Sequence, residues 1–113
     1  MRKTGPSAPA VAIVRRRSGT VCEVCGARRA NQIHHRRPRG AGGTRRPETN
    51  SPSALLDLCN ECHALIESRR EWARDHGYLV RQHLDPATTP VWLWGRWVLL
   101  ADDGQYLEHL ETA

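Results

Sequence analysis

Side chains with apolar or long aliphatic parts follow a helical period in one segment of the chain, between Cys62 and Gly77. The recurring positions are Leu65, Ile66, Arg69, Trp72 and Ala73. This spacing predicts a single helix that begins near Cys62, and Gly77 supplies its stop.

Shorter segments on either side have the composition of strands. Residues 20–35 indicate a short strand, a Cys-x-x-Cys-Gly turn and a return strand that ends at two histidines. The other strand-like segments are 78–84, a hairpin at 91–100, and a turn with a strand at 101–107. Residues 38–53 contain three Pro and three Gly and therefore predict a loop.

The four cysteines form two Cys-x-x-Cys pairs separated by 33 residues. They are Cys22, Cys25, Cys59 and Cys62. Two such pairs close readily on one tetrahedral ion, so we expect a structural Zn²⁺ held by four thiolates. A redox motif is the alternative, but it would not need a second copy. The longest apolar stretch, 91–100, is too short to span a bilayer and no signal peptide is visible, so we expect no membrane partner and a reducing cytoplasm.

The chain is short, and its composition limits the core that it can form. It has 113 residues, no Phe and one Met, which leaves four Trp and the aliphatic residues to build one modest core. A chain of this kind usually needs disulfides or a structural metal ion to stabilise its fold. We expect a flexible basic arm at 1–18, a zinc-stapled domain at 19–80, and a β extension at 81–113 packed on the same domain.

A second group of residues that can ligate metals lies between the two cysteine pairs and just after them. Successive helix residues point about 100° apart, so His63 would serve a different ion from Cys62. Glu67 lies four residues on and shares a face with His63, although such pairs are common on surface helices. Neighbouring strand residues point to opposite faces, so one of His34 and His35 can face a metal while the other faces a substrate. The alternative is that both are simply polar residues at a strand end.

Charge is divided unevenly along the chain. Residues 1–46 carry twelve Arg and Lys against one acid, a net charge of +11, whereas residues 47–113 carry a net charge of −6. This asymmetry favours a polyanion partner such as a nucleic acid, with solubility alone as the alternative. The phosphate-contacting tip of the basic arm would be Arg15, Arg16 and Arg17.

Four segments together resemble the HNH endonucleases, whose active site is a ββα-metal hairpin–helix. They read CEVC, IHHRRPRGAGG, NSPSALLDLCNECH and ESRREWARDHGYLV. The tail from Asp85 to Gly104 is similar to that of bacteriophage HNH proteins of actinobacterial hosts. The resemblance implies an α+β fold, with a small ββα-metal core stapled by the four-cysteine zinc and a C-terminal β-hairpin extension.

The resemblance also implies a role for each site residue. His34 and His63 would ligate one catalytic divalent ion (Mg²⁺, Mn²⁺, Ni²⁺ or Zn²⁺), with Glu67 in the third ligand position. His35 would be the general base that activates water for hydrolysis of a DNA phosphodiester. The residues implied to grip DNA phosphates are Arg36, Arg37, Arg39, Gly42, Arg45 and Arg46, besides the three arginines of the arm.

The chain departs from the family at the middle Asn of the HNH motif, where it has Ala54. Asn50 or Ser53 could take the place of that Asn, the alanine could be an inactivating change, or the domain could bind DNA without cutting it. We expect a phage-encoded, metal-dependent DNA endonuclease in the cytoplasm of a bacterial host. The alternative is a zinc-stapled DNA-binding module, or an adaptor that docks on phage packaging (terminase) proteins.

Overall fold

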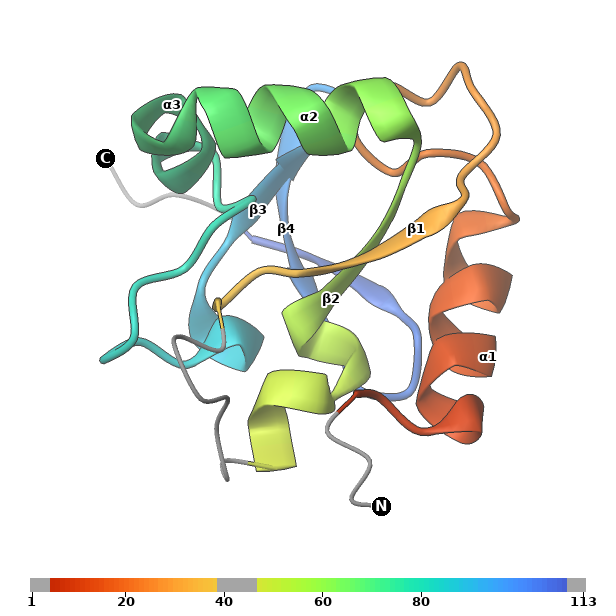
Figure 1. The fold of residues 1–113 in the computed structure, drawn as a ribbon. Helices are drawn as coiled ribbons and strands as arrows, with labels where there is room; N and C mark the ends of the chain where they lie inside the picture. Colours follow the sequence, from red (N-terminus) through yellow and green to blue (C-terminus); the bar gives the residue numbers. More distant parts are fainter. Residues whose placement is uncertain (1–4, 39–46, 110–113) are drawn as a thin grey trace.

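A two-stranded antiparallel sheet crosses the middle of the molecule and leads into a helix that runs along the top of the view in Figure 1. The computed structural model describes residues 5–38 and 47–109. In it β1 (Gln32–His35) pairs with β2 (Leu55–Leu58), with His34 opposite Leu56 and His35 opposite Leu55. Helix α2 (Asn60–Ser68) follows β2, and Cys59 caps it by accepting a hydrogen bond from the backbone N–H of Cys62 through its thiol sulfur. The described residues thus form a small α+β fold with helices and antiparallel sheets.

The helix predicted from Cys62 to Gly77 is two helices. α2 ends at Ser68, and α3 (Arg70–Asp75) begins after a break at Arg69, whose backbone has φ −127° and ψ 64°. The two pieces bury Ile66 and Ala73 completely. The apolar period persists across the break, which is why the sequence predicts one helix.

Gly77 ends α3, as predicted, in a left-handed conformation with φ +78°. A Cβ atom at this position would lie 2.0 Å from the carbonyl oxygen of Pro90. Glycine is therefore required here both by the backbone conformation and by the close approach of the chain before β3.

A second antiparallel sheet forms the C-terminal part of the fold. Its strands are β3 (Val91–Leu93), β4 (Arg96–Leu100) and β5 (Tyr106–Glu108), in that spatial order. The hairpin at 91–100 and the strand after it are thus confirmed. Short 3₁₀ turns lie at Pro47–Asn50, Pro52–Ala54 and Pro86–Thr88.

The strand predicted at 78–84 is absent and this expectation was wrong. Tyr78, Leu79 and Val80 are buried, but among the described residues they form no ladder. The backbone N–H of Val80 bonds to the carbonyl of Arg36, while that of Leu79 bonds to Ala73. The three apolar residues do become buried, but they do so without pairing as a strand.

The first described residues form a helix instead of the flexible arm predicted at 1–18. α1 (Ala8–Ser18) is capped by Ser7, whose hydroxyl accepts from the N–H of Ala10, and by left-handed Gly19. Val14 packs with no exposed surface. The two caps and the burial of Val14 stabilise this helix, whereas the basic composition of the segment had favoured a flexible arm. No helix in the described ranges has the length and apolar character needed to cross a membrane.

Candidate metal centres

The four cysteines converge from two segments that are distant in sequence. The Cys22–Cys25 turn and the entry into α2 bring all four sulfur atoms within 4.8 Å of one another. All four are free thiols, and the sulfurs of Cys25 and Cys59 are 4.0 Å apart. At a Zn–S distance of about 2.3 Å, tetrahedral geometry places sulfurs roughly 3.8 Å apart. The cluster is therefore compatible with a zinc site.

Electrostatics at this cluster also favour a bound cation. Burial raises the pKa of the Cys22 thiol, and burial together with the neighbouring thiols raises the pKa of the Cys62 thiol. Although burial opposes ionisation of Cys25 as well, backbone hydrogen bonds from Ala27 and Arg28 lower its pKa to about 6. Thiolates at this spacing repel one another, so a dication is the natural way to hold several of them charged.

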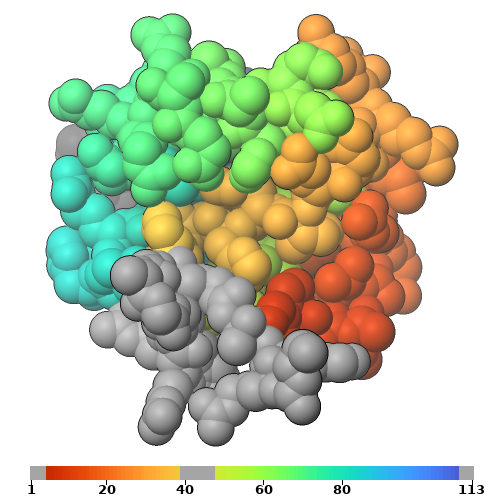
Figure 2. All heavy atoms as spheres, viewed as in Figure 1, coloured from red at the N-terminus to blue at the C-terminus, as the bar shows by residue number. Residues whose placement is uncertain are grey.

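Three further ligand-type side chains meet between β1 and α2. One nitrogen or oxygen atom from each of His34, His63 and Glu67 lies within 4.8 Å of the others. His63 and Glu67 share one face of α2, and the ring of His34 approaches that of His63 edge-on at 5.5 Å between centroids. Figure 2 shows the side chains of α2 packed directly over the segment that contains β1. His63 and Glu67 thus share a helix face, as their spacing predicts, and His34 lies beside them.

The backbone holds His34 in an orientation suited to ligation. Its Nε2 atom lies 2.8 Å from the carbonyl oxygen of Tyr78, and since a carbonyl only accepts, this nitrogen carries the hydrogen. Burial lowers the pKa of His34 to about 4, which keeps the ring neutral at physiological pH. The Nδ1 lone pair remains available, and a ligating histidine anchored by its other nitrogen is the usual arrangement at metal sites.

Glu67 is placed between two partners. One carboxylate oxygen lies 3.9 Å from Nε2 of His63, and the other accepts a hydrogen bond of 2.8 Å from Arg70. The carboxylate is about half exposed, so the site is open to solvent on this side. Arg70 was not predicted, although its position three residues after Glu67 is the spacing of a helical ion pair.

His35 lies on the other face of β1, as strand alternation predicts. Its Nε2 atom is 2.8 Å from Oδ1 of Asn50 in the 3₁₀ turn before β2. Because an amide oxygen only accepts, the hydrogen is on Nε2 and the Nδ1 lone pair is left to take a proton. Asn50 thus contacts His35, whereas the backbone N–H of Ser53 donates to Asp102 and Ala54 is fully buried.

Three of the arginines predicted to grip phosphate are internal, and those predictions were wrong. Arg17 forms a bidentate ion pair with Glu23 at 2.7 and 2.8 Å, with neither side chain exposed. Arg36 has no exposed surface. It donates to the backbone carbonyls of Gly77, Ser53, Pro86 and Thr89. A guanidinium has five donors in a rigid fork, which suits it to satisfying loop carbonyls as well as phosphates.

Arg37 is also buried, with its guanidinium bonded to the carbonyl of Leu84 and the hydroxyl of Thr49. Arg15 is partly exposed and lies 3.5 Å from Asp57, and Arg16 is exposed. The remaining predicted phosphate contacts lie outside the described residues; they are Arg39, Gly42, Arg45 and Arg46.

No family model, no curated protein and no solved structure matches this chain.

Proposed function

We propose that this chain is a metal-dependent endonuclease that hydrolyses DNA phosphodiesters. The observation that carries the proposal is the convergence of His34, His63 and Glu67 on one side of β1, with His35 anchored by Asn50 on the other. A ligand set of two imidazoles and one carboxylate suits a divalent cation and leaves coordination positions open to substrate and water.

The side chains divide the work between binding and proton transfer. His34, His63 and Glu67 would hold the divalent ion, which when bound would neutralise charge that develops on the phosphate oxygens. His35 accepts a proton at Nδ1 from the attacking water. The water oxygen forms a bond to phosphorus while the bond from phosphorus to the 3′ oxygen breaks, and that oxygen takes a proton from solvent. The products carry 5′-phosphate and 3′-hydroxyl ends.

The cysteine cluster would hold a structural Zn²⁺ that positions the site without taking part in the reaction. It joins the turn before β1 to the start of α2, and these two elements carry His34 and His63. Because the ligands come from segments more than thirty residues apart, the ion would fix the relative placement of both histidines.

Nicking of supercoiled plasmid by the zinc-loaded protein tests the proposal. Added Mg²⁺, Mn²⁺ or Ni²⁺ should convert supercoiled DNA to open circles, and His35→Ala should lower the rate by about 10²- to 10⁴-fold. His109→Ala changes a histidine outside both clusters and should nick at the parent rate. Equal rates for His35→Ala and the parent would contradict the assigned role of His35.

A DNA-binding module without cleavage is a second candidate, and the fully buried Ala54 favours it because this position lacks the Asn of the family. This candidate predicts salt-sensitive binding of duplex DNA, one tightly held zinc per chain and no nicking with any of the three added metals. A second, weaker metal whose binding is lost in His63→Ala would count against it.

A further inference from the structure

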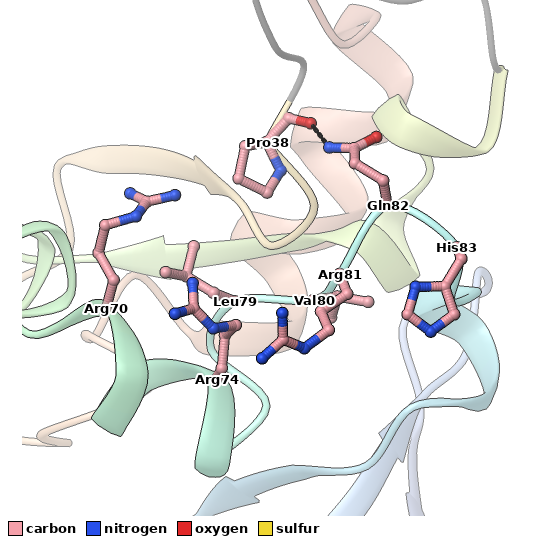
Figure 3. Close-up of a pocket in the computed structure, with 8 residues that line it drawn as sticks. All are labelled: Pro38, Arg70, Arg74, Leu79, Val80, Arg81, Gln82 and His83. Carbon is pink, nitrogen blue, oxygen red and sulfur yellow. Dashed lines mark hydrogen bonds between the residues drawn. The ribbon is translucent and has the colours of Figure 1, made fainter.

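A positively charged cavity of about 420 Å³ lies beside the candidate nuclease site (Figure 3). Arg70 and Arg74 of α3 line one side, and Arg81 lines another. Leu79 and Val80 form an apolar part of its wall. Among the described residues that line it there is no carboxylate.

Arg70 is paired with Glu67 outside the cavity, whereas Arg74 is incompletely satisfied. The Nε atom of Arg74 is buried and has no hydrogen-bond partner among the described residues. Figure 3 shows the guanidinium groups of Arg70, Arg74 and Arg81 disposed around the same space. A concave wall of one sign of charge concentrates the electrostatic potential and attracts an anion.

The cavity is joined to the candidate metal site by direct contacts. Arg70 donates to Glu67 at 2.8 Å and so belongs to both. Leu79 follows Tyr78, whose carbonyl oxygen lies 2.8 Å from Nε2 of His34. An anion bound in the cavity would therefore be a near neighbour of whatever binds at His34, His63 and Glu67.

The walls of the cavity are held in place before any ligand binds. The side-chain amide of Gln82 donates to the carbonyl oxygen of Pro38, and both residues line the cavity. The backbone N–H of Val80 donates to the carbonyl of Arg36 at 2.7 Å, and Arg37 donates to that of Leu84 at 2.9 Å. A preorganised wall reduces the ordering cost of binding.

We propose that this cavity binds a phosphate of the DNA strand that flanks the phosphate at the metal site. The inference rests on the proposed function, because the adjoining metal site is what favours a polynucleotide over a free anion. Guanidinium forks match phosphate oxygens in bidentate geometry.

The salt dependence of duplex binding tests this assignment. The zinc-loaded protein is titrated into a fluorescein-labelled 20-bp duplex without added Mg²⁺ or Mn²⁺, so that binding is measured without cleavage. Arg74→Gln combined with Arg81→Gln should weaken binding roughly tenfold and reduce the slope of log Kd against log salt by about 0.9, the value for one phosphate contact. Arg70 is left unchanged because it contacts Glu67.

The matched control is Arg29→Gln combined with Arg96→Gln, which removes two exposed charges outside the cavity. Equal losses in the two double variants would overturn the proposal, even if the parent nicks DNA. A loss of duplex affinity confined to the cavity variant would support the proposal. If the parent protein then failed to nick DNA, only the proposed nuclease activity would be refuted. Absence of duplex binding by the parent would overturn both.

Two further measurements keep the result decisive. If circular dichroism shows that the double variant is unfolded, Arg81→Gln alone decides, because this side chain is exposed. The slope of log Kd against log salt should then fall by up to about 0.9, and an unchanged slope would overturn the proposal. Titration with inorganic phosphate separates a free anion from DNA. Phosphate affinity that is lost in the cavity variant, with duplex affinity unchanged, would overturn the assignment to DNA.

Discussion

The Nε2 atom of His35 lies 2.8 Å from the Oδ1 atom of Asn50. His35 comes from β1 and Asn50 from the 3₁₀ turn Pro47–Asn50, so the contact holds the imidazole against a separate segment. Under the proposed function, Asn50 would hold the general base His35 in place.

Asn50→Ala should therefore lower the nicking rate by roughly ten- to a hundredfold, the usual loss when a residue that orients a site histidine is removed. Affinity for duplex DNA should be unchanged, because the ring of His35 loses orientation but no phosphate contact is removed. The check is to measure, for the parent and Asn50→Ala, the nicking rate at saturating DNA and the affinity for duplex DNA. Asn31→Ala, which removes an exposed amide before β1, serves as the control. If Asn50→Ala lost duplex affinity but kept the parent nicking rate, the positioning role would be contradicted.

Arg36→Met should destabilise the fold by at least about 3 kcal/mol, because several buried carbonyl oxygens would lose their donor together. Arg29→Met makes the same chemical change at an exposed position and should alter the free energy of unfolding by less than about 0.5 kcal/mol. Urea denaturation of both variants measures the difference, and similar values would show that Arg36 is not a structural residue.

Tyr106→Phe should change the alkaline stability of the protein. Burial, and then the adjacent charge of Glu23, raises the pKa of Tyr106, whose hydroxyl donates to Glu23 at 2.6 Å. Above pH 10 the unfolded tyrosine loses its proton while the folded one keeps it, so folding stability falls as pH rises. The variant should be about 1 kcal/mol less stable at pH 7 but should lose less stability between pH 10 and 11. Parallel curves of unfolding free energy against pH would contradict this.

Removal of zinc should unfold the protein or lower its melting temperature sharply. The four sulfurs hold two segments together, and a chain with this small a core has few other means of stapling them. A chelator titration followed by circular dichroism, with a colorimetric count of released metal, should show about one zinc per chain released with the loss of structure. Release of the metal without any change in melting temperature would argue against a structural role.

The elements predicted correctly from the sequence are those in which local pattern and tertiary contact agree. The paired cysteines, the alternation at His34-His35 and the hairpin at 91–100 each depend on spacing within a few residues. The signals for α1 were also present, in Ser7 and Gly19, but the basic composition of the arm outweighed them in the prediction.

The arginines show what spacing cannot reveal. Arg36 and Arg39 lie in one basic run, yet Arg36 is wholly buried because loops from distant parts of the chain present their carbonyls to it. The break at Arg69 has a similar origin, since the apolar period continues across it. Both features depend on partners that are far away in sequence.

The position of Arg36 has a consequence for local motion. Its guanidinium donates to carbonyl oxygens in the 3₁₀ turn Pro52–Ala54, just after α3, and in and just after the 3₁₀ turn Pro86–Thr88. If any one of these segments moves away, both its carbonyl and the buried guanidinium lose hydrogen bonds. Segments joined in this way open together rather than one at a time. Amide hydrogens throughout the three segments should then exchange with solvent at a common rate, as one cooperative unit.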